Sequence, residues 1–194
     1  NQPKFQAPVI ASKPDRGIEG TAAAPSNGPT LASADGPELA EPTIGTAPAA
    51  PKTAAERLIV QAHELSSQAQ TEEEFTRVIT TCRHTLASQP TTPVAHYANE
   101  LASWALNRRG QIKAETGRTK EASLDFDDAI RLNAECWRAI HNRGVLQAEA
   151  GNFEGAFDDF NRTIQIKPDF AKAYSNRAAL FVLANDLQPA LSDY

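Results

Sequence analysis

The sequence predicts an all-α solenoid of stacked helical hairpins that follows a disordered, Pro- and Ala-rich leader. Three observations predict this fold class. Nine of the thirteen prolines lie within residues 1–52, helix-capping signals begin at Thr53, and Arg109-Gly110 recurs as Arg143-Gly144, 143 − 109 = 34 residues later. The balance of 41% hydrophobic and 22% charged residues is that of a globular protein.

Residues 1–52 are small and proline-interrupted, as in TAAAPSNGPTLASADGPELAEPTIGTAPAAP, with few large apolar side chains. Such a segment buries too little apolar surface to offset the entropy lost on ordering, so we expect a disordered linker or leader. Its composition is typical of tethers in bacterial extracytoplasmic proteins, which favours a periplasmic or secreted location over the cytoplasmic alternative. Because the chain starts at Asn1 and contains no methionine, we expect a processed or cut N-terminus.

Residues 53–92 are predicted to form a helical hairpin. Thr53 precedes Glu56 by three residues, and Thr71 precedes Glu74 by three, which is the spacing of a capping box. The second helix of this hairpin carries its apolar residues on one face, at Phe75, Val78, Ile79, Cys82 and Leu86.

Residues 93–194 carry the repeat. Pro93 opens a long helix over about residues 94–115, and Gly117 ends it. Matching residues then recur in columns: Leu106, Ile140 and Tyr174; Arg109, Arg143 and Arg177; Gly110, Gly144 and Ala178; Ala122, Ala156 and Ala190; Asp125, Asp159 and Asp193; Phe126, Phe160 and Tyr194. A left-handed backbone is expected between the two helices of each unit, at Gly117, Gly151 and Asn185.

This period and pattern resemble the tetratricopeptide repeat, a helix-turn-helix unit with a large residue early in its first helix, a small residue soon after, and Ala in its second helix. The resemblance implies units at 103–136, 137–170 and 171–194, the last truncated, so the natural protein is expected to continue. Pro168 holds the closing position of the second unit, whereas Ala134 departs from it in the first. Residues 53–92 resemble a divergent unit.

Stacked hairpins bury a continuous core, so small residues are expected where helices touch and large aromatic residues between them. We therefore interpret the Gly110 column as helix contacts and the Phe126 column as core side chains.

The arginine column has two interpretations. In register, Arg109, Arg143 and Arg177 could line a surface that binds anions. Each is also followed sixteen residues later by an aspartate, so an ion pair between the two helices of one unit accounts for both columns. We favour the ion pair, worth about 0–1 kcal/mol if it is exposed.

In tetratricopeptide arrays the first helix of each unit lines a concave groove. The resemblance therefore implies a peptide-binding groove lined by these helices. Glu115, Val145 and Glu149 also fall at groove positions of the repeat. The candidate residues are Trp104, Asn107, Arg108, Gln111, Arg138, His141, Asn142, Lys172, Ser175 and Asn176.

The charges of this groove favour an acidic or C-terminal peptide as guest. Arg108, Arg138 and Lys172 advance one repeat at a time along it, and Asn142 and Asn176 can hydrogen-bond a peptide backbone. The alternative is that a polar groove is the ordinary solvent-facing side of a soluble solenoid.

Some co-chaperones of this family bind a C-terminal carboxylate through a clamp of lysines, asparagines and an arginine. This chain matches that clamp at Asn142 and Lys172, but has Asn107, Gln111 and Asn176 where Lys, Asn and Arg are needed. The clamp is therefore not expected here.

Catalysis, metal binding and cofactors are not expected. The adjacent carboxylates of Asp127-Asp128, like those of Asp158-Asp159, point about 100° apart on a helix and cannot share one proton-transfer centre. Cys82 and His84 face different ways on a predicted helix, so they do not form a metal site. The sequence contains no phosphate-binding Gly-rich loop, nucleophile elbow or zinc-binding HExxH.

Composition also bears on partners. The formal charge of −5 and pI near 5.4 argue against nucleic acid, and no apolar run reaches the length of a membrane-spanning helix. Cys82 and Cys136 are favoured as free thiols over a single disulfide.

The predicted function is a protein–protein interaction scaffold that binds an extended peptide or partner helix in its groove. The alternative is a non-catalytic repeat region of a larger enzyme or receptor that serves oligomerisation or substrate presentation. Self-association is a further option, because the incomplete third unit leaves an apolar helix face.

Overall fold

A computed structural model describes Leu31 and residues 53–193 of the chain. The disorder predicted for residues 1–52 lies outside the described residues, Leu31 excepted. The described part is all helical, without strands, so the all-α prediction is confirmed. The helices are α1 (Ala54–Ser66), α2 (Glu72–Ala87), α3 (Thr92–Glu115), α4 (Thr119–Leu132), α5 (Trp137–Glu149), α6 (Phe153–Ile166), α7 (Ala171–Leu183) and α8 (Leu187–Asp193).

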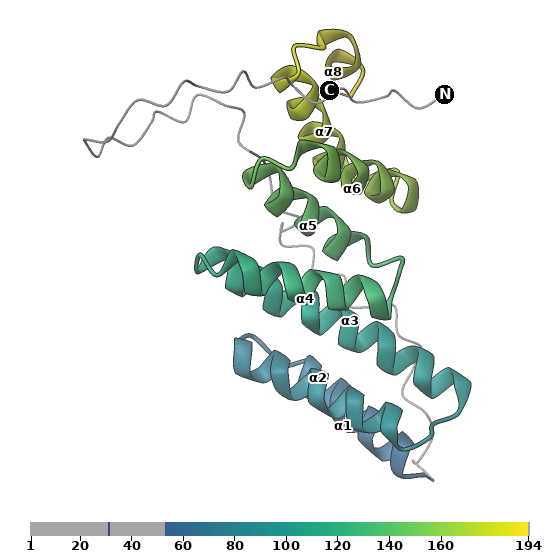
Figure 1. Cartoon of the computed structure of the whole chain (residues 1–194). Helices are drawn as coiled ribbons and strands as arrows, with labels where there is room; N and C mark the ends of the chain where they lie inside the picture. The colour runs from purple at the N-terminus through teal and green to yellow at the C-terminus, as the bar shows by residue number, and fades with distance from the viewer. Residues whose placement is uncertain (1–30, 32–52, 194) are drawn as a thin grey trace, which may run out of the picture.

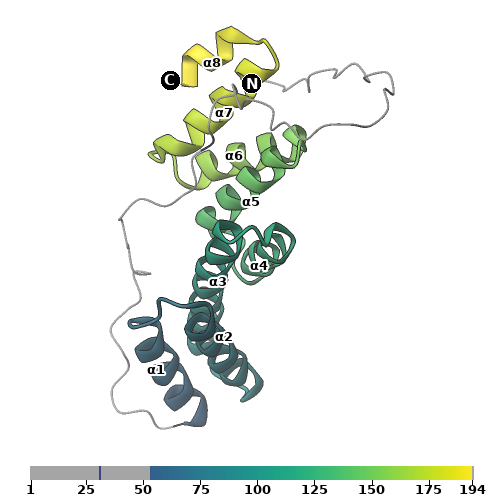
Figure 2. The same ribbon diagram turned by 90° about the vertical axis from the view of Figure 1, so that its left-hand side faces the viewer.

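Consecutive helices pair as hairpins, α1 with α2, α3 with α4, α5 with α6 and α7 with α8, and the hairpins stack in chain order (Figures 1 and 2). The second helices of the last three hairpins begin at Thr119, Phe153 and Leu187, so each step is 34 residues (153 − 119 and 187 − 153). This helical-hairpin solenoid agrees with the tetratricopeptide resemblance.

Both predicted capping boxes are formed. The Thr53 hydroxyl accepts a hydrogen bond from the backbone N–H of Glu56, whose carboxylate accepts one from the Thr53 N–H, and Thr71 and Glu74 make the same pair of bonds. Helix α3 instead begins with Pro93 in its first turn and has no side-chain cap. Local sequence thus sets where the first two helices begin.

The turn inside each of the last three hairpins uses the left-handed conformation, as predicted. The φ angle is 77° at Gly117, 81° at Gly151 and 57° at Asn185. Gln89, two residues after the end of α2, also has this conformation, with φ of 51°, which the sequence did not predict.

Two glycines let the helices of a hairpin approach each other closely. A Cβ atom added at Gly110 would lie 2.7 Å from a ring carbon of Phe126, and one at Gly144 would lie 2.9 Å from a ring carbon of Phe160. Both rings are buried, at 1% and 0% exposure. The small and aromatic columns are therefore helix contacts and core residues; Tyr194, the third aromatic, lies outside the described residues.

The apolar core falls into two clusters. The first joins α1 to α5 and includes the buried α2 face around Phe75, with Leu86 partly buried. The second joins α5 to α8 around Phe160 and Phe181, and Leu31 packs against it. Because each hairpin shares its core with its neighbours, the hairpins support one another.

The arginine and aspartate columns form the predicted ion pairs. All three pairs are bidentate, with the arginine nitrogens 2.5–2.9 Å from the carboxylate oxygens. The pairs are Arg109–Asp125, Arg143–Asp159 and Arg177–Asp193. The aspartate side chains are only 6–7% exposed, so these are not the exposed pairs that the sequence estimate assumed.

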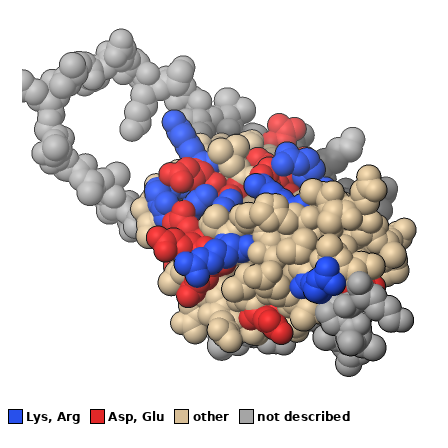
Figure 3. Space-filling view, turned by 90° about the horizontal axis from the view of Figure 1, so that it is seen from below, with Lys and Arg blue, Asp and Glu red and all other residues tan. Residues whose placement is uncertain are grey.

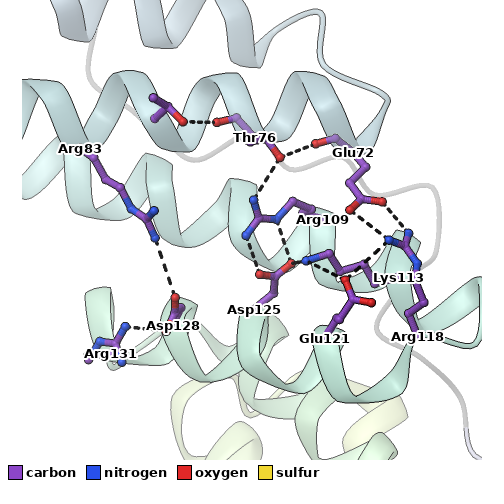
Figure 4. A network of polar contacts seen from close by, with 11 residues as sticks. Glu72, Thr76, Arg83, Arg109, Lys113, Arg118, Glu121, Asp125, Asp128 and Arg131 are labelled. Carbon is purple, nitrogen blue, oxygen red and sulfur yellow. Dashed lines mark hydrogen bonds and ion pairs between the residues drawn. The ribbon is translucent and has the colours of Figure 1, made fainter.

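The first of these pairs belongs to a network that joins three helices (Figure 4). Arg109 of α3 also donates to the Thr76 hydroxyl of α2, and Lys113 of α3 lies 2.9 Å from a carboxylate oxygen of Asp125. Arg118, just before α4, pairs with Glu72 of α2. The network fixes α2 of the first hairpin to α3 and α4.

The surface charges are mixed. Viewed from below in Figure 3, basic and acidic side chains lie next to one another on one part of the surface, and the rest is largely uncharged. Within residues 53–193, every helix is too short or too polar to cross a membrane.

The cysteines are free thiols in the structure. Cys82 is fully buried in the first core cluster, and this burial raises the pKa of its thiol to about 12. Cys136 is partly exposed.

Candidate peptide-binding groove

A row of buried polar side chains crosses α3, α5 and α7, the first helices of the three repeats. Asn142 of α5 donates its amide N–H to the Asn107 side-chain oxygen of α3, at 3.0 Å. The Asn176 amide nitrogen of α7 lies 3.1 Å from Nε2 of His141 on α5. All four side chains are at most 3% exposed. These residues, expected from sequence to face a guest, therefore also join one repeat to the next.

Three buried polar atoms in this row have no hydrogen-bond partner in the described structure: Asn107 Nδ2, Gln111 Nε2 and His141 Nδ1. Both amide nitrogens are donors, and Nδ1 of His141 is a donor in one tautomer of the neutral ring and an acceptor in the other. The row thus contains two amide donors that lack acceptors, with an unpaired ring nitrogen of His141 beside them. Buried polar groups are nearly always paired in native proteins, so such a cluster calls for a functional explanation.

The ring of His141 is held neutral. Burial is the main cause that lowers its pKa from 6.5 to about 4, and the nearby Lys172 charge lowers it further against an opposing hydrogen bond with Asn142. The rings of Phe160 and Phe170 pack against it, with centroids 5.4 and 5.0 Å away. At neutral pH the ring therefore acts as a hydrogen-bonding group and carries no charge.

A pocket of about 410 Å³ opens between α3 and α5. It has apolar walls, two buried amide side chains and two acidic residues at its exposed margin. Its lining residues are Gln111, Ala114, Glu115, Phe126, Asn142, Val145, Leu146 and Glu149.

The charged candidates lie beside this row and are engaged with their neighbours. Arg108 donates to the Gln111 side-chain oxygen at 3.1 Å, and the guanidinium of Arg138 lies 4.1 Å from the centre of the Trp137 ring. Lys172 is partly exposed and near His141.

Two further candidates lie apart from the pocket. Trp104 packs edge-on against Phe75 of α2, with ring centroids 5.6 Å apart, and so contributes to the first core cluster. Ser175 is exposed on α7.

The structure therefore brings Gln111 and Asn142 into one pocket, links Asn107, His141 and Asn176 into the adjoining row, and spreads the other candidates beyond it. The sequence did not predict Phe126 as a residue of the groove. Its 34-residue register indicated a core side chain, which it is, but one edge of a core ring can also form a pocket wall.

No family model and no curated protein matches the chain. Among solved structures, the crystal structure of MamA is 17% identical with a TM-score of 0.47, covering 70% of this chain and 81% of that one. A tetratricopeptide repeat protein from Parabacteroides merdae is 20% identical with a TM-score of 0.47, covering 72% of this chain and 50% of that one. MamA from Desulfovibrio magneticus RS-1 is 16% identical with a TM-score of 0.43, covering 72% and 71%.

Proposed function

We propose that the chain is a protein-interaction scaffold that binds an extended segment of a partner protein across α3, α5 and α7, and that it carries out no reaction itself. The observation that carries this proposal is the cluster of buried nitrogen atoms without a hydrogen-bond partner on Asn107, Gln111 and His141. All three were candidate groove residues on sequence grounds, and the amides of Asn107 and Gln111 offer N–H groups on adjoining turns of α3.

An extended peptide supplies what these donors lack. Its backbone carries a carbonyl acceptor at every residue, and successive carbonyls point to alternate sides. The Gln111 amide lines the pocket, where such a carbonyl can accept from it. A buried donor without an acceptor costs about 1–3 kcal/mol of free energy. A guest that supplies the acceptor removes this cost, which favours binding at the polar row.

The positive side chains beside the row suggest acidic residues in part of the guest. Arg138 and Lys172 stand in the first turns of α5 and α7, where the helix dipole disfavours positive charge. By contrast, α1, α2, α4 and α6 carry acidic residues in the first turn. Charges placed against the dipole are better explained by a ligand than by helix stability.

The test is selection of peptides from a random dodecapeptide library displayed on phage, using the full chain as bait. Selected peptides are then titrated against wild type and against a triple alanine variant of Arg108, Arg138 and Lys172. The matched control is the triple alanine variant of three exposed basic residues on other surfaces, namely Arg57, Lys120 and Arg131.

We expect selected peptides that bind wild type and the control with equal affinity, and bind the groove variant at least about tenfold more weakly. Far-UV circular dichroism must show that all three proteins are equally helical. Equal binding by both variants, or no selected peptide at all, would contradict a peptide-binding groove at these residues.

A second candidate function is self-association. The exposed large apolar residues of α7 and α8 are Val182, Leu183, Leu187 and Leu191, at 40%, 43%, 55% and 71% exposure. A second copy could cover this face. Light scattering tests it: a mass that rises with concentration, and falls to the monomer in L187E/L191E, supports association, whereas a constant monomer mass excludes it.

A further inference from the structure

The pocket between α3 and α5 has a chemistry of its own within the candidate groove. Phe126, Val145, Leu146 and the methyl group of Ala114 give it apolar walls. At 410 Å³ it has room for a long side chain together with the backbone beside it. Its guest should therefore have an extended aliphatic part.

The open margin of the pocket is negative. Glu115 and Glu149 are the last residues of α3 and α5, and their 34-residue spacing (149 − 115) puts them at corresponding places in neighbouring units. Both are exposed, and neither has an interaction with another described residue. A cation between them would meet two carboxylates that no protein group neutralises.

The helix ends add to this negative potential. The last carbonyl groups of a helix point outward and carry its partial negative charge, so a carboxylate in that place is unfavourable for the helix itself. Helix α5 has no basic residue in its last turn to offset Glu149. At the end of α5 the sequence thus adds negative charge to the pocket at a cost to helix stability.

The floor of the pocket supplies a donor. Gln111 is 5% exposed, its side-chain oxygen accepts from Arg108, and its Nε2 has no partner. The bond from Arg108 fixes which end of the amide remains available. A backbone carbonyl of the guest is the acceptor that an extended segment would bring there.

We propose that this pocket binds a lysine or arginine side chain of the partner segment. The methylene groups of that side chain lie against Phe126 and Val145, its charge lies between Glu115 and Glu149, and a carbonyl next to it accepts from Gln111. This inference rests on the proposed function. It also specifies the sequence of the partner segment further. Acidic residues of the segment lie near Arg138 and Lys172, and one basic residue lies at the other end of the helices.

The same random dodecapeptide selection tests the inference, with the full chain as wild type and as E115Q/E149Q. The matched control is E64Q/E154Q, which removes the same net charge from exposed positions on α1 and α6. We expect wild type and control to enrich one lysine or arginine at a fixed distance from the acidic residues. The E115Q/E149Q variant should lose that enrichment and bind a selected peptide about tenfold more weakly.

A charge exchange makes the assignment specific. The E149K variant should reject the selected peptide and accept its counterpart in which the basic residue is replaced by glutamate. If peptides are enriched without a fixed basic residue, or if E115Q/E149Q keeps full affinity, the pocket assignment is wrong while the groove stands. If no peptide is enriched by any form, the proposed function itself fails.

Discussion

The buried ring of His141 should make the stability of the fold depend on pH between the ordinary and the lowered pKa of that ring. In the folded chain its pKa is lowered from 6.5 to about 4, because burial disfavours the charged ring and Lys172 repels it. Between these two values the unfolded chain binds a proton that the folded chain does not. The free energy of unfolding must therefore fall as pH falls through this window.

The size of the effect follows from the two pKa values. Complete titration of the ring costs about 3 kcal/mol, and moving from about pH 7 to about pH 5 costs about 2 kcal/mol. Below about pH 4 both states are protonated and this ring contributes no further slope. Near about pH 5, carboxylates whose pKa is lowered in the folded chain stay ionised. Glu72 is one of them, and its pKa is lowered mainly by its hydrogen bond with Arg118.

The assay is urea unfolding followed by far-UV circular dichroism at both pH values, for wild type, H141Q and H96Q. His96 is the control because its side chain is 73% exposed. H141Q lowers stability at neutral pH through lost packing, so the informative quantity is the change between the two pH values. We expect that change to be about 2 kcal/mol smaller in H141Q than in wild type and H96Q. The same loss in all three proteins would refute the reasoning.

Three further results are expected from the packing of the repeats. G110A should lower the free energy of unfolding by about 1–2 kcal/mol, because the clash with Phe126 outweighs the better helix propensity of alanine. Urea unfolding of G110A/F126L should show a loss smaller than the sum of the losses in the two single variants. R143A should cost about 3 kcal/mol, because the buried Asp159 carboxylate loses its charged partner and retains, in the described structure, only the side-chain hydrogen bond from Gln147; R143A/D159N should regain part of it, and an additive double variant would contradict this. Cys82 should resist maleimide in the native protein and react only on unfolding, as read by mass spectrometry, and rapid labelling without denaturant would contradict its burial.

The helical architecture could be predicted from sequence because its signals are local and repeated. Capping boxes at Thr53 and Thr71 need only residues three positions apart, and the turn at Gly117 needs only one backbone conformation. The ion pair of Arg143 with Asp159 was also predictable, because a hairpin fixes which residues of its two helices meet.

The energetics and the groove were harder to predict because they depend on how neighbouring repeats pack. Asn107 and His141 read as groove residues by position, yet each forms a hydrogen bond to the next repeat, 35 residues on. No periodic pattern shows whether a polar side chain faces solvent or the adjoining helix. Burial of Asp159 likewise depends on how closely α5 packs against α6, and that packing makes its ion pair with Arg143 a largely buried one.

The most direct measurement of the central claim is an NMR titration that follows side-chain amide resonances as a selected peptide is added. The Gln111 amide reports on the groove, and the exposed Gln61 on α1 is the internal control. We predict that the Gln111 resonances shift downfield and saturate with the peptide, as an unpaired donor gains an acceptor, while those of Gln61 stay in place. Saturating shifts at Gln61, with none at Gln111, would show that the peptide binds elsewhere and would contradict the account.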